Sequence, residues 1–309
     1  MRSVDSRIRT AYAQCRTLAT RHYENFPVAS WFVPADKRDA LAVIYAFARC
    51  ADDFADEPGP GVEARLASLA EWRSMLDPCI AGKAEHPVFV ALGDVIQTFN
   101  LRREHFENML CAFEMDVRVS RHRDFTALLD YCRCSANPVG RLVLELFGHR
   151  EPELFALSDN ICTALQLTNF WQDSAIDIGR DRIYLPLEDL AHFGLSVTDL
   201  GSLLVSPNRV PPKVLFDRWQ GLMASLVGRT KELFELGKPL PDMVVPGVRR
   251  QLRLTWLGGM TILARIEDAG YDVFRHRPTL STLDFVRLYL RAGIRSGETE
   301  RIPAERSRA

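Results

Sequence analysis

Apolar residues recur three and four positions apart along eight long stretches of this chain, and this spacing limits the fold more than any other feature. The period matches the turn of an α-helix, so each stretch predicts a helix with one face toward a core. Sustained alternation of polar and apolar residues, which is typical of strands, is scarce. We therefore predict an all-α protein with helices at about 36–56, 62–76, 86–99, 102–118, 124–147, 152–177, 212–237 and 246–269.

The chain has 309 residues, 47% of them hydrophobic, and can bury a substantial core. No repeat of fixed period and no convincing linker divides it. We predict one domain over residues 1–296 and a flexible tail over 297–309, because the last residues lack an apolar face. Asp36 and Asp124 are predicted N-caps, and 205–212 is predicted to be a loop.

Charge and cysteine content argue against several classes of protein. The formal net charge is −1, so the chain lacks the basic excess of nucleic-acid-binding proteins. No run of about 18 apolar residues predicts a membrane span, and the N-terminal arginines are not followed by the apolar segment of a signal peptide. None of the seven cysteines forms a CxxC pair, so we expect reduced thiols in a cytoplasmic protein.

The predicted helix 36–56 carries three aspartates within five residues, directly after an apolar run. Four of its polar residues are 4, 3 and 4 positions apart, so they stack on one helix face, with a third aspartate beside them. We call this face the first acidic stripe: Tyr45, Arg49, Asp52, Asp53 and Asp56.

The predicted helix 152–177 repeats the arrangement. Two amides and two carboxylates, 3, 4 and 4 positions apart, form one polar line on an otherwise apolar helix. Arg182 follows this line and adds positive charge. Polar stripes on apolar helices are expected to face each other across a cavity. We call this line the second acidic stripe: Gln166, Asn169, Asp173 and Asp177.

Facing carboxylates without balancing lysines require cations. Oxygen ligands favour Mg²⁺, which usually retains waters and binds substrate phosphates, so we predict that the five aspartates hold magnesium and that magnesium holds a phosphate or diphosphate. Arg49 and Tyr45 would then contact phosphate oxygens. Two alternatives are solvated helix faces and a di-iron carboxylate bundle, although no histidine has Glu three residues before it as such bundles require.

The segment 130–148 contains Pro138, which removes a backbone donor and predicts a kink. Small residues near the proline leave room beside the helix. Two interpretations remain open: one kinked helix that walls an elongated apolar cavity together with Tyr131, or two helices joined at Asn137 and Pro138.

Three motifs, in this order and at this spacing, resemble the squalene/phytoene synthase family: Tyr45 to Asp56, YCRCSANPVG from Tyr131, and QLTNFWQDSAIDIGRDRIYLP from Gln166. The resemblance extends through Ser281 and implies an isoprenoid synthase, a single helical bundle around a central apolar cavity. It implies metal binding at Asp52, Asp56, Asp173 and Asp177, diphosphate contacts from Tyr45, Arg49, Gln166 and Asn169, and a position near the reacting carbons for Tyr131.

Residues 22–34 (HYENFPVASWFVP), SANPVGRLVL and NFWQD look most like the hopanoid-pathway branch, which converts presqualene diphosphate and water to hydroxysqualene. Condensing members usually carry Arg where this chain has Gln172, and several carry Tyr near Gly258 and Gly259. The resemblance therefore implies Mg²⁺ without NADPH, and pathway neighbours that make presqualene diphosphate and reduce hydroxysqualene. Polar candidates for holding the attacking water are Tyr131, Asn137 and Gln172.

Three alternatives stay open. The first is condensation of two prenyl diphosphates to presqualene diphosphate, phytoene or squalene. The second is a non-catalytic assembly module that retains the fold, and the third is a head-to-tail prenyltransferase or terpene cyclase, whose aspartate motifs differ in form. Because the implied substrate and product are greasy, we also expect peripheral contact with the inner face of a membrane.

Overall fold

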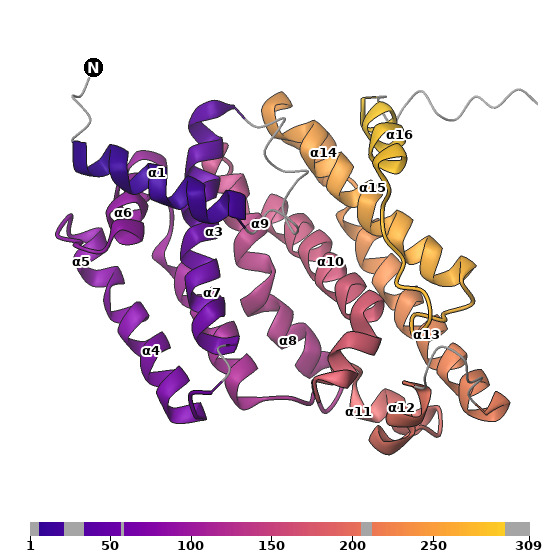
Figure 1. Cartoon of the computed structure of the whole chain (residues 1–309). Helices are drawn as coiled ribbons and strands as arrows, with labels where there is room; N and C mark the ends of the chain where they lie inside the picture. The colour runs from indigo at the N-terminus through magenta and orange to yellow at the C-terminus, as the bar shows by residue number, and fades with distance from the viewer. Residues whose placement is uncertain (1–5, 22–33, 57–58, 205–211, 294–309) are drawn as a thin grey trace, which may run out of the picture.

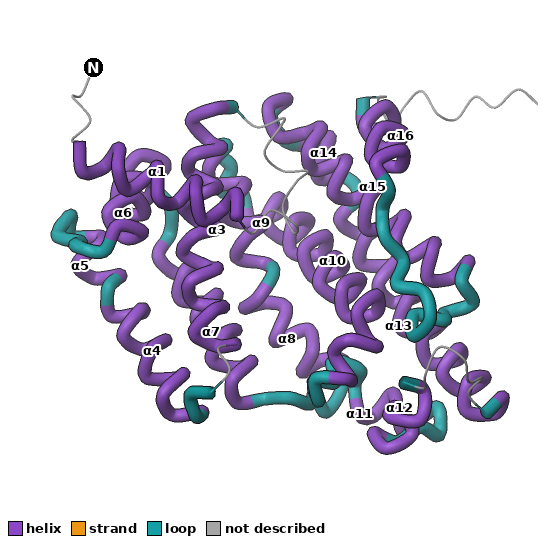
Figure 2. Tube along the Cα trace, viewed as in Figure 1, coloured by secondary structure: helices purple, strands orange, loops and turns teal. Residues whose placement is uncertain are grey.

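The computed structural model describes residues 6–21, 34–56, 59–204 and 212–293. Within these ranges every extended regular element is a helix, which confirms the all-α prediction, and Figure 2 shows the helices joined mostly by short loops. The helices are α1 (Ser6–Arg21), α3 (Ala35–Asp56), α4 (Val62–Ser74), α5 (Leu76–Ile80), α6 (Pro87–Phe99), α7 (Arg103–Arg118), α8 (Phe125–Ser135), α9 (Asn137–Leu146), α10 (Pro152–Gly179), α11 (Leu187–His192), α12 (Val197–Leu203), α13 (Lys213–Gly237), α14 (Leu240–Met243), α15 (Pro246–Asp268) and α16 (Thr282–Ala292).

The two helices that carry the acidic stripes, α3 and α10, each organise one half of the molecule (Figure 1). α3 packs against α1, α4, α6 and α7, whereas α10 packs against α8, α9, α13 and α15. Each half has its own hydrophobic cluster, and Val143 and Phe147 at the end of α9 pack against both clusters. The helices that carry the two stripes therefore belong to different halves of the molecule, and the two halves meet at α9.

The rotation of α10 about its axis is fixed by its buried face. Trp171 is completely buried, and its indole N–H donates a 2.8 Å hydrogen bond to Thr230 Oγ1 on α13. Leu167 and Phe170 are buried on the same helix. Burial of a Trp or Phe side chain stabilises a fold by several kcal/mol, so this face holds α10 with its polar stripe turned away from α13.

The predicted helix 124–147 consists of two helices, so the second of the two interpretations holds. α8 ends at Ser135, Ala136 breaks the helical path, and α9 starts at Asn137. Pro138 lies in the first turn of α9, where its missing N–H has no intrahelical acceptor to lose. The proline therefore starts a helix and does not kink one.

Asp124 is the N-cap of α8, as predicted, and its carboxylate accepts a 2.7 Å hydrogen bond from the Ala127 N–H. The N-cap prediction for Asp36 is wrong: α3 begins at Ala35, and Asp36 lies within its first turn. The predicted tail 297–309, residues 22–33 and the loop positions 205–211 lie outside the described residues.

Several helices were not anticipated from the apolar spacing. α1 is polar enough to hide its period, and α16 is short, although Ser281 and Asp284 form a capping box at its start. All seven cysteines are free, as expected. Across the described part of the chain, no helix combines the length and apolarity that crossing a bilayer would require.

Candidate active site

An apolar cavity of about 620 Å³ lies between α9, α10, α15 and α16. Val139, Gly140 and Val143 line it from α9, so the segment after the proline forms a cavity wall although the kinked-helix interpretation that included this wall is wrong. The opposite wall is α15, which contributes Gly258 and Gly259. The lining is mainly apolar side chains, with Asn169, Gln172 and Arg277 among the polar exceptions.

The two glycines of α15 have different surroundings. A Cβ atom on Gly259 would overlap the ring of Phe234 and lie 3.0 Å from Leu165 Cδ2, whereas a Cβ atom on Gly258 would meet only Leu280 Cδ1, at 3.7 Å. We expect Gly259→Ala to destabilise the protein by about 1–3 kcal/mol through overpacking. Gly258→Ala is the matched control, and should be neutral or mildly stabilising because alanine favours helix. Urea unfolding of both variants measures this, and equal stabilities would contradict the packing argument.

The first acidic stripe lies on one face of α3, as predicted. Arg49 Nη1 donates a 3.1 Å hydrogen bond to Asp52, and Nη2 pairs with Asp53. Burial raises the pKa of Asp52, the negative charge of Asp56 raises it further, and Arg49 opposes both. The pKa of Tyr45 is also raised by burial, with Arg49 lowering it and Asp52 raising it. The stripe is therefore partly desolvated and electrostatically coupled.

The second acidic stripe continues along α10 beside the cavity. Arg277, from the loop before α16, forms an ion pair with Asp173. Burial and the negative charge of Asp173 raise the pKa of Asp177 to about 6. Asn169 lines the cavity, whereas Gln166 is half-buried and lies outside its lining. The second acidic stripe therefore runs from Asn169, which lines the cavity, to Asp173 and Asp177, which lie outside the cavity lining.

Gln172 lies next to this stripe and also lines the cavity. Its side-chain amide donates a hydrogen bond to the Pro278 carbonyl, which ties α10 to the loop that carries Arg277. The cation near Asp173 therefore comes from that loop, at the end of the cavity, while the residue directly before Asp173 is a neutral amide.

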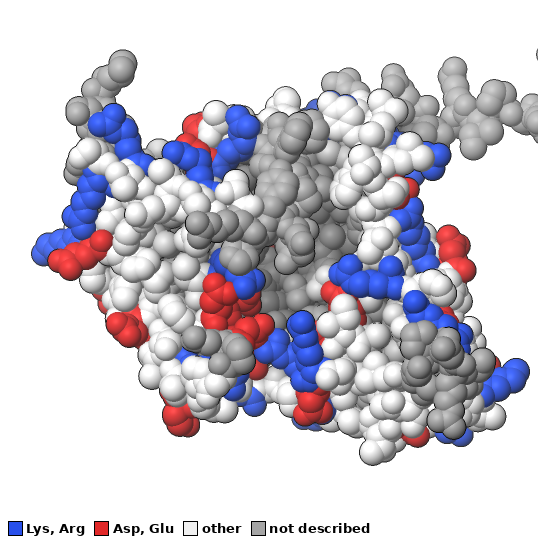
Figure 3. All heavy atoms as spheres, viewed as in Figure 1, with Lys and Arg blue, Asp and Glu red and all other residues white. Residues whose placement is uncertain are grey.

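Arg182 brings the two stripes together. Its guanidinium pairs with Asp56 of the first stripe, and this hydrogen bond raises the pKa of Arg182. The same positive charge opposes the upward pKa shifts of Asp52 and Asp177. Figure 3 shows acidic side chains gathered over the C-terminal end of α3, with basic side chains beside them toward α10. Arg182 therefore links the first stripe to the C-terminal end of the second, while the prediction that the two stripes share metal stays a prediction.

The loop that holds Arg182 is anchored to the loop after α7. Ile183 forms an isolated β-bridge with Arg121, and the Ile183 N–H donates a 3.0 Å hydrogen bond to the Ser120 carbonyl. Arg121 also pairs with Asp181, whose backbone is in the left-handed region at φ 60°. These contacts keep Arg182 directed toward α3.

Asp116, at the end of α7, was missed in the sequence. Its carboxylate accepts hydrogen bonds from the hydroxyls of Tyr131, at 3.0 Å, and Tyr184, at 3.5 Å. Burial raises the pKa of Asp116 to about 7, against the lowering effects of Tyr131 and Arg182. A lone aspartate in an amphipathic helix has no spacing signal, so only the fold places it beside the stripes.

Asp116 should make stability depend on pH. Because folding raises its pKa, the folded protein keeps a proton that the unfolded chain releases above about pH 4, so the stability contributed by this proton is lost as pH rises toward 7. Asp116→Asn removes this titration. We expect the variant's Tm, relative to wild type, to be at least about 3 °C higher at pH 8 than at pH 5. A difference that does not change with pH would contradict the assignment.

Tyr131 is buried but does not line the cavity, so the structure does not support the prediction that it forms part of the cavity wall. It packs against Phe170, Tyr184 and His122, and its hydroxyl is bound to Asp116. Phe170 lies on α10 and stacks on Tyr184 with ring centroids 3.8 Å apart. Tyr184 in turn binds Asp116, so the aromatic cluster connects Asp116 to α10. Tyr131 lies on α8, before the helix break at Ala136, whereas the cavity lining comes from α9, after the break.

Asn137 is also buried outside the cavity lining. Its side-chain oxygen accepts a 2.9 Å hydrogen bond from Thr163, and it borders a separate pocket of about 540 Å³ together with Arg141 and Asp159. The structure therefore does not place Asn137 where a water in the apolar cavity would be held.

The residues of the two stripes suit Mg²⁺ in their chemistry. All predicted ligands are carboxylate oxygens, and the pKa values of Asp52 and Asp177 are raised first by burial and then by the charge of a neighbouring aspartate, a repulsion that a divalent cation relieves. In the described ranges, however, no three acidic, histidine or cysteine side chains form a ready-made metal cluster, and arginines pair with Asp56 and Asp173. Waters and substrate phosphates would have to complete the coordination.

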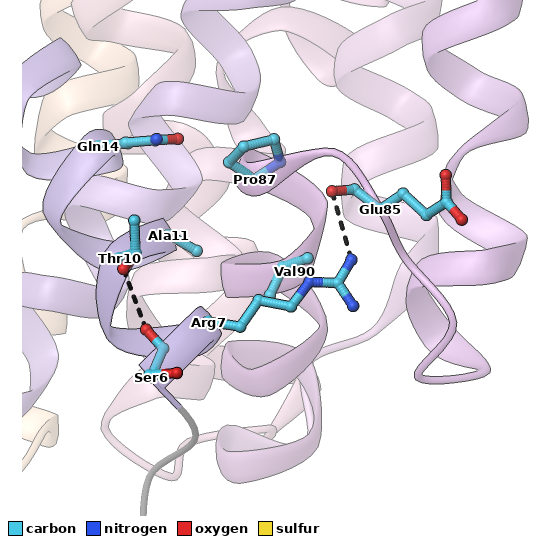
Figure 4. A pocket seen from close by; sticks show the side chains of 8 residues that line it. All are labelled: Ser6, Arg7, Thr10, Ala11, Gln14, Glu85, Pro87 and Val90. Atoms are coloured by element: carbon cyan, nitrogen blue, oxygen red, sulfur yellow. Dashed lines mark hydrogen bonds between the residues drawn. The ribbon is translucent and has the colours of Figure 1, made fainter.

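A smaller pocket of about 250 Å³ lies between α1 and the start of α6 (Figure 4). There Arg7 donates hydrogen bonds to the backbone carbonyls of Ala84, at 2.7 Å, and Glu85, at 3.5 Å. None of its lining residues belongs to the acidic stripes, and its contacts tie α1 to the loop before α6. We assign it a structural role.

Comparison with known proteins decides the family. Residues 19–284 match the sequence profile of squalene/phytoene synthases. The chain belongs to the squalene/phytoene synthase family. Its solved relatives include a squalene synthase, HpnC, from Alicyclobacillus acidocaldarius, with 39% sequence identity and a TM-score of 0.79, which covers 87% of this chain and 97% of that one. The isoprenoid-synthase helical fold is thereby established.

Relatives with different activities match this chain at similar levels. A hydroxysqualene synthase from Rhodopseudomonas palustris is 34% identical over 233 residues, which cover 75% of each chain. A phytoene synthase from Arthrospira platensis is 30% identical over 285 residues, which cover 88% of this chain and 89% of the other. The family and its enzymatic character follow from these matches, and the particular reaction does not.

Proposed function

We propose that this chain is a hydroxysqualene synthase, which converts presqualene diphosphate and water to hydroxysqualene and diphosphate. The observation that carries the proposal is the arrangement around α10, whose polar stripe begins at the apolar cavity with Asn169 and ends at Asp177, where Arg182 links it to Asp56 of the first stripe. A charged head at the stripes and a hydrocarbon body in the cavity match a prenyl diphosphate. The resemblance to a hydroxysqualene synthase favours the addition of water.

The chain's own residues would bind and orient the substrate. Asp52, Asp56, Asp173 and Asp177 would hold Mg²⁺, which when bound supplies positive charge to the departing diphosphate oxygens. Arg49, Arg182 and Arg277 lie beside these carboxylates and can transfer their hydrogen bonds to the diphosphate. Positive charge fixed where negative charge develops lowers the barrier to departure.

The carbon chemistry would take place in the apolar cavity. The bond between carbon and the diphosphate oxygen breaks, and the electron pair leaves with the oxygen. The resulting cyclopropylcarbinyl cation opens and rearranges, a water oxygen then bonds to carbon, and a proton is released. A mainly apolar lining keeps other water away from the cation until that step. The proposed reaction of presqualene diphosphate with water consumes no reductant, so NADPH is not required.

Product analysis by mass spectrometry tests this proposal. Purified enzyme with presqualene diphosphate and Mg²⁺ should form hydroxysqualene at the same rate with and without NADPH. Farnesyl diphosphate alone should remain unreacted. Conversion of farnesyl diphosphate to presqualene diphosphate would instead favour a condensing enzyme, which the phytoene synthase relative keeps as the second candidate.

We also propose that the protein is cytoplasmic and acts between two pathway enzymes, one that makes presqualene diphosphate and one that reduces hydroxysqualene. Both neighbouring compounds carry long hydrocarbon chains, so exchange at a membrane surface is favoured over exchange through water. Enzyme activity that requires no added partner protein would be consistent with diffusion of these compounds along the membrane.

A further inference from the structure

The outer face of α16 exposes a line of large apolar side chains. Leu283, Val286 and Leu290 are 57%, 52% and 63% exposed, and their spacing of three and four residues places them on one side of the helix. The other side of α16 is also apolar, since Phe285 and Leu288 line the cavity. The helix is therefore a thin apolar wall between the cavity and the surroundings.

Positive charge accompanies this line. Arg287 and Arg291 are exposed on α16. The helix has one acidic residue, Asp284, and its carboxylate is engaged by Ser281 and by Arg265, at 2.6 Å. A helix with an apolar line beside exposed basic side chains has the pattern of helices that lie in the interface of an anionic bilayer.

The neighbouring elements extend the apolar surface. Met243 and Val245, at the turn between α14 and α15, are also exposed. α16 packs along α15 with the guanidinium of Arg250 3.6 Å from the ring centroid of Tyr289, which brings the end of α16 toward the start of α15. Figure 1 shows α14, α16 and the start of α15 at one edge of the molecule.

We propose that this edge, called the α16 surface and formed by Leu283, Val286, Leu290, Met243 and Val245 with Arg287 and Arg291, docks on an anionic lipid bilayer. Charge complementarity and the adjacent cavity favour this partner. α16 is held on α15 by a small hydrophobic cluster, Leu254, Leu288 and Ala292, together with the contacts of Arg250 with Tyr289 and of Arg265 with Asp284. A hydrocarbon that leaves the cavity past α16 would thus enter lipid directly. Docking does not depend on which family reaction is catalysed.

Vesicle flotation tests the proposal with the full chain. We expect binding to vesicles with equal parts of phosphatidylcholine and phosphatidylglycerol, and at least about tenfold weaker binding to phosphatidylcholine alone. The double variant Val286→Asp/Leu290→Asp should lose at least about tenfold in binding. The matched control Val62→Asp/Val197→Asp makes the same change at exposed valines at the starts of α4 and α12, and should bind like wild type.

A second variant guards against misfolding. Arg287→Ala/Arg291→Ala should keep the wild-type Tm and lose the preference for phosphatidylglycerol. Weak wild-type binding to anionic vesicles, or aspartate variants that bind like wild type, would overturn the proposal. Light scattering that shows a wild-type dimer converted to monomer by Val286→Asp/Leu290→Asp would identify the surface as a self-interface and would also overturn it. Turnover of detergent-dispersed substrate should be unchanged in these variants, so failure of the reaction and failure of docking are separate results.

Discussion

Replacing Asp52 or Asp173 with alanine should lower turnover of presqualene diphosphate by at least about a hundredfold, because each change removes a fixed charge from the place where the diphosphate leaves. The two residues come from different helices, one partnered with Arg49 and the other with Arg277. Loss of either should therefore disable the same step. Initial rates at saturating Mg²⁺ measure the effect.

Asp217→Ala is the matched control for these two variants. Asp217 is an exposed aspartate that pairs with Lys213 on α13, so its loss also breaks an ion pair and removes one charge. It should leave turnover unchanged. Near-normal rates in both Asp52→Ala and Asp173→Ala would show that the stripes do not carry the reaction.

Arg182→Ala should lower kcat/KM by about thirtyfold, since it removes the cation that joins the stripes. Arg182 pairs with Asp56 and acts on Asp52, Asp116 and Asp177, so its loss leaves four carboxylates without a shared counter-charge. Both ion-pair partners are partly exposed, which keeps the expected effect below that of a fully buried pair. Steady-state kinetics over a range of substrate concentrations measures the change.

Arg182→Lys should recover part of the lost kcat/KM, because lysine keeps the charge but not the two-pronged geometry of the guanidinium. Arg133→Ala is a suitable control, since Arg133 forms an exposed ion pair with Asp130 away from the stripes. If the Arg182→Ala enzyme had the wild-type kcat/KM, the interactions of Arg182 with the carboxylates would not contribute to catalysis.

The helical period predicted the long helices and both stripes because burial of an apolar face leaves a strong, local signal. Asp52 and Asp177 were found for this reason: each is one of several polar residues in phase on an apolar helix. Asp124 was found because an N-cap depends on its immediate neighbours. Features determined by local spacing were therefore accessible without coordinates.

Features that depend on contacts between distant segments were not accessible. Asp116 meets Tyr131 and Tyr184 only because α7, α8 and the loop after α10 fold together. Arg277 lies 104 positions from its partner Asp173, and no spacing rule links them. The sequence around Pro138 is compatible with one kinked helix or with two helices, and only the folded structure shows that two helices form.

The affinity for inorganic diphosphate, measured by calorimetry with and without Mg²⁺, tests most directly whether the stripes act together. We predict binding that requires Mg²⁺ and is lost in Asp173→Ala and in Asp52→Ala alike. Equal affinity in the presence of a chelator, or undiminished binding in both variants, would contradict the view that two carboxylate helices share magnesium around one diphosphate.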